Sequence, residues 1–348
     1  MGHATRSRVS IDHLASRGHE VLVAASGQAQ RVFARSPHRV LPIVGLTMRC
    51  EEGGLDLRGS LEDNARRLPL LLMTNASAWA TAQAFRPDAV VTDFDFFSWA
   101  TARALGVPLV SIDNGLAVNL CETPQRILPD GPLTSLQAFN RCMVPDADRY
   151  VLTTFSWPRV RTDYERSVTL VPPILRREVL DATRSLATQP AARGAHVLVY
   201  KTGSLDDQSF LGALARVPEA RFLVYGLKAP DARLPPNVTP RPFDEAAFLR
   251  DVATSRGVVG NGGMSLIGEA LALGRPIHAV PVRGQFEQVL NAGYISELGY
   301  GSAGDALEPD ALRAFLERAP EYERAIRARP QHDDNALLYA TLDQTFPS

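Results

Sequence analysis

One stretch of the sequence, residues 257–292, has the residue types and the order of elements that suit phosphate binding. A short apolar run predicts a strand that ends at Val259, and the residues after it are rich in glycine: Gly260, Gly262 and Gly263. Apolar residues then recur at helical spacing, at positions 266, 270 and 273. Small residues at such a turn leave the first N–H groups of the helix and its positive dipole end accessible, so we expect an anion there.

A carboxylate further along the predicted helix extends this candidate site. Ser265 is expected to open the helix, and Glu269 follows on the same face, roughly 6 Å further along at about 1.5 Å per residue. A phosphate at the helix start would place an attached ribose near Glu269, whose carboxylate can accept hydrogen bonds from two vicinal hydroxyls. We expect this helix position to be exposed, so that alanine at position 269 would change fold stability little.

The residues after the helix complete the unit and add polar groups. Gly274 is expected to end the helix, and the apolar run 277–282 predicts a buried second strand, which gives a βαβ unit. Three polar side chains beyond it suit a polyhydroxylated ligand such as a sugar: Gln285, Glu287 and Gln288. Each feature alone also has a structural explanation, since glycine turns are common in α/β proteins and a helical glutamate is often merely solvated.

Composition restricts the class of protein. The chain has 348 residues, of which 45% are hydrophobic and 22% charged, and this is enough for two domains with their own cores. The net charge of −1 and the scattered basic residues argue against a nucleic-acid partner. The three cysteines lack C-x-x-C spacing, which favours a reducing cytoplasm over a disulfide scaffold or a zinc site. No signal peptide or spanning apolar run is recognisable, and a peripheral contact with a membrane surface stays open.

Apolar runs and helical segments alternate along both halves of the chain, as in doubly wound sheets. The strands expected in the first half are 20–25, 40–44, 150–155 and 169–171, and those in the second half are 196–200, 221–224 and 238–241. A polar loop is expected at 49–59 and a helix at 61–84, within which the run 68–73 favours a core face over an acceptor-site lining. Pro172 and Pro173 predict the junction between two domains, because prolines stiffen a connection.

The segment 87–114 is expected to form strand, turn, helix and strand. Asp93 falls just past the carboxyl end of the first of these strands, where ligands gather in open α/β sheets. A second candidate phosphate loop, Thr202, Gly203 and Ser204, follows the strand 196–200, although an ordinary turn explains these residues equally well.

The ordered set of residues in 261–292 resembles the donor-nucleotide signature of GT-B glycosyltransferases. NGGMS at 261–265 is followed by Glu269, then by Pro281, EQ at 287–288 and NA at 291–292. The sequence is most similar to bacterial and archaeal enzymes related to the peptidoglycan N-acetylglucosaminyltransferase, of glycosyltransferase family 28 or family 1 type. The resemblance implies that the helix start holds the donor diphosphate, that Glu269 binds the ribose and that the acidic–Gln pair contacts the donor sugar.

The donor residues that this resemblance implies are Asn261, Gly262, Gly263, Met264, Ser265, Glu269, Gln285, Glu287 and Gln288. Phe243 occupies the place where the family covers the nucleotide base, although an aromatic residue there can equally belong to a core.

The resemblance extends to the amino end, where Gly2 to Arg6 read G-H-A-T-R. In the family this motif is the loop after the first strand, so that strand is expected to be missing here, and we expect about ten to fifteen further residues in the complete gene product. His3 is the implied general base, since an imidazole with a pKa of about 6.5 can be neutral at working pH. The family places Asp93 beside this histidine, which it orients.

The expected fold is α/β of the GT-B type, with two Rossmann-like domains facing one another across a cleft. Residues 1–172 would bind the acceptor, 173–330 the nucleotide sugar, and a helix in 331–348 would cross back to the first domain. The expected enzyme is a hexosyltransferase of EC class 2.4 that needs neither cofactor nor metal, because the helix start would neutralise the leaving diphosphate. The expected donor is a UDP-sugar, and the acceptor is a glycan, a lipid-linked or a small molecule.

Two other functions remain open from the sequence. A non-hydrolysing nucleotide-sugar epimerase shares the fold and the same nucleotide contacts, and it would epimerise its donor without any acceptor. A non-catalytic nucleotide-binding protein would bind the donor but neither transfer nor hydrolyse it.

Overall fold

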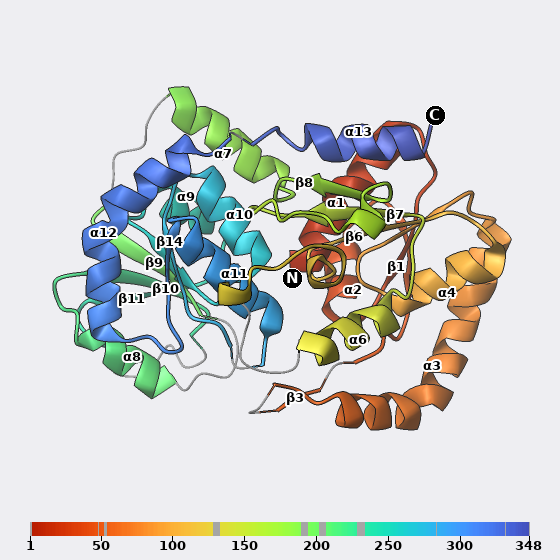
Figure 1. Ribbon diagram of the computed structural model, residues 1–348, viewed down its shortest axis with the longest axis horizontal. Coiled ribbons are helices and arrows are strands. Elements are labelled where there is room, and N and C mark those ends of the chain that lie inside the picture. Colours follow the sequence, from red (N-terminus) through yellow and green to blue (C-terminus); the bar gives the residue numbers. More distant parts are fainter. Residues whose placement is uncertain are drawn as a thin grey trace. The chain divides into compact units, whose positions relative to one another are not determined.

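The computed structural model describes residues 2–47, 49–51, 54–127, 133–188, 194–201, 207–227, 234–282, 284–330 and 332–347. The chain divides into two compact units, each built from parallel strands and helices (Figure 1). The first contains Met1–Gln125, Asp130–Ile174 and Asn335–Ser348, and the second contains Arg126–Pro129 and Leu175–Asp334. The predicted α/β class with two Rossmann-like units is confirmed.

The first unit contains two separate parallel sheets. β1 (Leu22–Ala25) pairs with β2 (Arg39–Pro42). The other sheet has the order β5 (Val90–Thr92), β6 (Leu109–Asp113), β7 (Arg149–Thr153), β8 (Val168–Val171). A short antiparallel pair, β3 (Cys50–Glu51) and β4 (Gly54–Leu55), lies in the segment expected to be a loop. β1 and β5 therefore belong to two different sheets.

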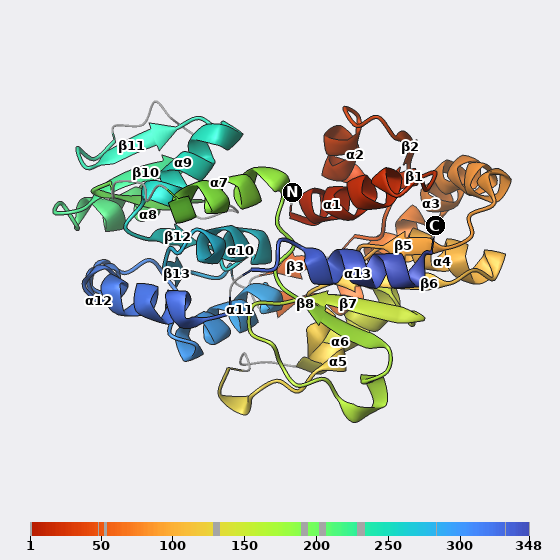
Figure 2. The same ribbon diagram turned by 90° about the horizontal axis from the view of Figure 1, so that it is seen from above.

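Helices cover these sheets. They are α1 (Gly2–Ser16), α2 (Gly27–Phe33), α3 (Leu57–Phe85), α4 (Phe96–Leu105), α5 (Ala117–Leu120), α6 (Leu133–Met143) and α13 (Ala336–Thr345), with a 3-10 turn at Thr162–Tyr164. A second 3-10 turn, Gln125–Ile127, begins in this unit, but its last two residues belong to the second unit. α13 lies along α1 (Figure 2), where the rings of His13 and Tyr339 stack with centroids 4.2 Å apart. The last helix thus belongs to the first unit.

The apolar run in α3 corrects one expectation. Within the run 68–73, only Leu71 is buried, and the large exposed side chains are Leu68, Leu70, Leu72 and Met73. The run is therefore mostly a surface and not a core face. None of the described helices is both long and apolar enough to span a membrane.

The second unit has one parallel sheet of six strands. Its order is β11 (Val238–Arg241), β10 (Arg221–Tyr225), β9 (His196–Tyr200), β12 (Val258–Gly260), β13 (Ile277–Ala279), β14 (Gly301–Ala303). The helices are α7 (Arg177–Thr188), α8 (Asp207–Ala215), α9 (Glu245–Thr254), α10 (Met264–Ala272), α11 (Phe286–Glu297) and α12 (Pro309–Ala328). The strands predicted around β9, β10 and β11 are confirmed: β9 and β10 are apolar runs with buried centres, whereas in β11 only Val238 is buried. β13 ends earlier than expected, before Pro281, which has no N–H to donate.

Candidate functional site

The first candidate site lies where α1 begins, in the first unit. His3 is in the first turn of this helix, not in a loop before it, and its side chain is 55% exposed. Nδ1 of His3 lies 2.7 Å from Oδ1 of Asp93, which directly follows β5. The structure therefore brings together the two residues that sequence placed 90 positions apart.

Arg6 is the buried centre of this cluster, and sequence reasoning did not select it. Its Nε donates to Oδ2 of Asp93 at 2.9 Å and its Nη2 to Oδ1, which makes a bidentate ion pair. Nη1 donates to Oδ1 of Asn114 at 2.6 Å, and Nη2 lies 3.2 Å from Oδ1 of Asp113 and 2.8 Å from Nδ1 of His3. One signal in the sequence could have selected Arg6: it lies three residues after His3, and residues three apart on a helix share a face.

The charges in this cluster determine its protonation. Burial would raise the pKa of Asp93, but the cation of Arg6 and the ring of His3 hold that pKa well below its usual range. Removal from water lowers the pKa of His3, whereas the Asp93 carboxylate raises it against the opposing effect of Arg6, and the net pKa is raised. Ser7 adds a hydrogen bond from Oγ to Oδ2 of Asp93 at 2.7 Å. The imidazole is thus placed to take up a proton beside a permanent carboxylate.

The same cluster has the donor set of a small metal site. Ligand atoms of His3, Asp93 and Asp113 all lie within 4.8 Å of one another. The guanidinium of Arg6, however, already bonds to both carboxylates. A divalent cation would have to displace this buried cation, so the residues present do not fit a metal.

The second candidate site is the turn between β12 and α10, in the second unit. Gly262 has φ +79°, and a Cβ there would lie 2.9 Å from the carbonyl oxygen of Gln288, so only glycine fits. Nδ2 of Asn291 donates to the carbonyl of Gly262 at 2.9 Å and holds the turn. α10 begins at Met264 after Gly263, and among the described residues no side-chain hydrogen bond caps this helix start. Its first N–H groups can therefore bind an anion, with Ser265 exposed beside them.

Glu269 is buried, which corrects the expectation of an exposed position. Only 8% of this residue is exposed, because α7 packs against α10. Oε1 of Glu269 accepts a hydrogen bond from Nε of Arg176 at 3.0 Å, and Arg176 also pairs with Glu245. Burial raises the pKa of Glu269, and Arg176 only partly opposes this effect. The carboxylate is held in place by an arginine that sequence reasoning missed.

The remaining polar residues predicted for the donor site make hydrogen bonds to the backbone or lie at the start of α11. Gln288 accepts a hydrogen bond at Oε1 from the N–H of Val282 at 2.9 Å, and Asn261 donates to the carbonyl of Val280 at 3.3 Å. Gln285 is the N-cap residue of α11, and Glu287 lies in the first turn of that helix. Of these residues, Gln288 lies against the Gly262 turn, through its backbone carbonyl.

Phe243 follows β11, and 56% of it is exposed. Its ring centroid lies 5.7 Å from that of Phe248 and 6.5 Å from those of Tyr200 and Tyr225. It is thus the exposed edge of an aromatic cluster, not a core residue, and it offers a face on which a planar ring can stack. Thr202, Gly203 and Ser204 lie outside the described residues.

Comparison with known proteins places the chain in a family. The glycosyl transferase family 1 profile matches residues 1–320. A glycosyltransferase of Methanosarcina mazei is 25% identical over 337 residues, which cover 86% of this chain and 82% of that protein. One of Methanosarcina acetivorans is 25% identical over 336 residues, with the same shares of 86% and 82%.

Solved structures show the same fold. MurG of Acinetobacter baumannii has a TM-score of 0.62 at 16% identity, covering 99% of this chain and 96% of that one. UGT2 of Phytolacca americana, complexed with UDP-2-fluoro-glucose and pterostilbene, has a TM-score of 0.67 at 16% identity, with coverage of 99% and 97%. VinC in complex with DTDP has a TM-score of 0.61 at 16% identity, covering 99% and 97%. Because the family profile spans almost the whole chain and the fold is that of GT-B enzymes, this protein is a glycosyltransferase that belongs to glycosyl transferase family 1.

Proposed function

We propose that this glycosyltransferase moves a sugar from a nucleoside-diphosphate donor to an acceptor hydroxyl, with His3 as the general base and without a metal ion. The observation that carries the proposal is the contact of 2.7 Å between His3 and Asp93, with the imidazole more than half exposed. Family membership favours transfer over the epimerase and over a non-catalytic protein.

The geometry of the pair supports base catalysis. With Nδ1–H donating to Asp93, Nε2 is left to accept the proton of an acceptor hydroxyl. Asp93 fixes this tautomer and stabilises the imidazolium that forms when the proton arrives. Because Arg6 holds both oxygens of Asp93, the carboxylate cannot rotate away from the ring.

The second unit supports binding of the donor. The uncapped first turn of α10 can accept the diphosphate and stabilise its charge as the sugar departs. Oε1 of Glu269 is held by Arg176, and Oε2 can accept hydrogen bonds from ribose hydroxyls. Phe243 can stack on the base. Two proteins of similar fold were solved with UDP-2-fluoro-glucose and DTDP, which supports a nucleoside-diphosphate sugar as the donor. A UDP-sugar is the first candidate.

Two features support the absence of a metal and the kind of acceptor. Both acidic groups of the first unit already pair with Arg6, and the helix start of α10 supplies positive potential for the leaving group. The exposed apolar residues of α3, among them Leu72 and Met73, support an acceptor with an apolar part or one at a membrane surface.

The test compares transfer rates for His3→Ala, Asp93→Asn and the double variant, with donors first selected by thermal shift from a panel of nucleoside diphosphates. Each single change should lower turnover by about 10² to 10⁴, and the double variant should be scarcely worse, because the pair acts as one unit. Donor affinity should not change. Additive losses, or an active His3→Ala, would refute the assignment, and epimerised donor formed without acceptor would favour the epimerase.

A further inference from the structure

The proposed chemistry leaves one charged contact of the second unit unused, the ion pair of Arg176 with Glu245. Arg176 directly precedes α7, and its guanidinium bonds to carboxylates on two other helices. Nε donates to Oε1 of Glu269 on α10 at 3.0 Å, and Nη1 pairs with Oε1 of Glu245, the first residue of α9. One arginine thus connects three helices of this unit.

The two ion pairs differ in burial. The side chains of Arg176 and Glu269 are 13% and 11% exposed, whereas that of Glu245 is 56% exposed. The backbone of Arg176 is fixed, because its carbonyl accepts the first N–H groups of α7, those of Val179 and Leu180. An exposed ion pair contributes little to stability, so the fold has little need of Glu245. What Glu245 can determine is the orientation of the buried guanidinium.

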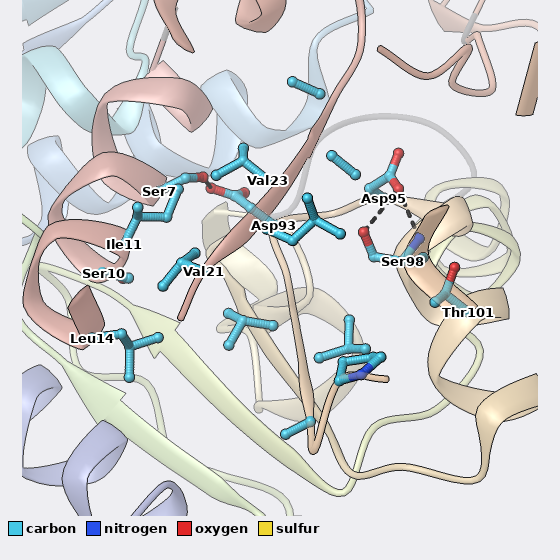
Figure 3. Close-up of a pocket in the computed structure, with 18 of the residues that line it drawn as sticks. Ser7, Ser10, Ile11, Leu14, Val21, Val23, Asp93, Asp95, Ser98 and Thr101 are labelled. Carbon is cyan, nitrogen blue, oxygen red and sulfur yellow. Dashed lines mark hydrogen bonds between the residues drawn. The ribbon is translucent and has the colours of Figure 1, made fainter. Parts of the chain in front are cut away.

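An arginine beside a carboxylate favours edge-on pairing, with two parallel hydrogen bonds to the two oxygens. The first unit shows this arrangement, since Nε and Nη2 of Arg6 donate to Oδ2 and Oδ1 of Asp93. Ser7 then adds its single bond to Oδ2 (Figure 3). A carboxylate that is paired edge-on therefore has no open edge for a second partner with two donors.

Glu269 lacks the second of these two bonds. Nε of Arg176 reaches Oε1 of Glu269, and among the described residues no hydrogen bond reaches Oε2. Glu245 holds the same guanidinium at Nη1. Vicinal ribose hydroxyls supply two donors, as the edge of a guanidinium does, so they need the carboxylate edge that edge-on pairing would fill. The single bond therefore leaves Glu269 open to a ribose.

Glu245 also lies beside the residue proposed to stack on the base. Asp244 caps α9 by accepting a backbone hydrogen bond at 2.7 Å, and Phe243 directly precedes this cap. Burial and the carboxylate of Glu269 raise the pKa of Tyr200, whose ring centroid lies 6.5 Å from that of Phe243. The aromatic face and the carboxylate are thus close to one another, as binding of one nucleoside requires.

We propose that Glu245 is a positioning residue for the donor nucleoside: it holds Arg176 away from edge-on pairing with Glu269, so that this carboxylate stays open to the ribose hydroxyls. This role rests on the proposed function, which places the ribose at Glu269. The expected sign is opposite to that of simple electrostatics. Removal of an acidic side chain near an anionic ligand ordinarily favours binding, because repulsion falls, whereas removal of Glu245 should weaken it.

The test measures binding of UDP and of 2′,3′-dideoxy-UDP, which lacks both ribose hydroxyls, by calorimetric titration at one salt concentration. Glu245→Gln should weaken UDP binding at least about threefold, a part of the loss expected for Glu269→Ala. It should not weaken binding of 2′,3′-dideoxy-UDP. The double variant should bind UDP no more weakly than Glu269→Ala alone, because both changes act on one contact.

Glu219→Gln is the matched control. The side chain of Glu219 is also 56% exposed, and it pairs at 2.8 Å with Arg313 on α12 of the same unit. This change should alter the affinity for neither nucleotide. Both Glu219→Gln and Glu245→Gln should lower Tm by no more than about 4 °C, as expected for exposed ion pairs.

Three results would overturn the role of Glu245. Tighter UDP binding by Glu245→Gln would show that the released Arg176 pairs with the diphosphate instead. Equal weakening of both nucleotides would show a structural effect on the whole site, and unchanged UDP affinity would show no effect at all. In each case a loss of UDP affinity in Glu269→Ala would leave the proposed donor site standing. UDP binding that Glu269→Ala does not weaken would refute the ribose contact itself.

Discussion

The most demanding prediction concerns Arg6→Met, which removes the cation from the cluster of the first candidate site. Arg6 is 7% exposed, and it is bonded to Asp93 and Asp113, whose side chains are 13% and 2% exposed. The variant leaves two buried carboxylates without their cation, a change that typically costs about 3–5 kcal/mol of folding free energy. At about 2–4 °C per kcal/mol for a domain of this size, Tm should fall by roughly 6–20 °C.

The pH dependence of this loss has a definite sign. In the native protein the pKa of Asp93 lies below its unfolded value of about 3.9, so its contribution is present above that pH and is lost as pH falls through the folded pKa. In Arg6→Met, burial without the cation should instead raise the pKa of Asp93. The carboxylate then becomes neutral on mild acidification, and the stability difference between the two proteins should narrow from pH 7 to pH 4.5.

Urea denaturation at the two pH values measures this difference. Arg8→Met is the matched control, because Arg8 is on the same helix but its side chain is 63% exposed and pairs with Asp12 at the surface. That change should cost no more than about 0.5 kcal/mol. Arg6→Lys should recover part of the loss, since lysine restores the charge but not the planar fork. The reasoning fails if Arg6→Met behaves like Arg8→Met, or if its cost is the same at both pH values.

Three further predictions follow from the two sites. Because the base must be neutral and the pKa of His3 is raised, kcat/KM should fall on the acid side with an apparent pKa above 6.5. Asp93→Asn should move this acid limb of the pH profile to lower pH. An acid limb that does not move would show that Asp93 does not act on His3. Glu269→Ala should weaken nucleoside-diphosphate binding about ten- to a hundredfold in calorimetric titration. It should also destabilise the fold, because Arg176 loses a buried partner. Glu269→Gln keeps the shape of the side chain, so it should bind the nucleotide almost as weakly as Glu269→Ala but unfold less readily. Gly262→Ala should lower Tm and donor affinity together, whereas Gly263→Ala, with nothing within 4 Å of its Cβ, should change both little; equal effects would show that the Gly262 backbone is not essential.

Local patterns determined the elements of this protein. The βαβ unit around Gly262 was predictable because an apolar run, a glycine turn and apolar residues at helical spacing all lie within a short segment. The position of Asp93 after a strand was predictable for the same reason. The pairing of His3 with Asp93 followed only from the resemblance, since no local pattern links residues 90 positions apart.

Tertiary packing decided what each polar or apolar residue does. Arg6 and Arg8 are two arginines on one amino-terminal helix, yet one is buried against two carboxylates and the other is solvated, because only one faces β5 and β6. Glu269 became a buried ion-pair partner because α7 packs over α10, and the apolar residues of α3 stayed exposed because nothing in that unit covers them among the described residues. Sequence determines which face of an element is apolar or charged, whereas the partner of that face comes from chain segments far away, and only the folded chain selects it.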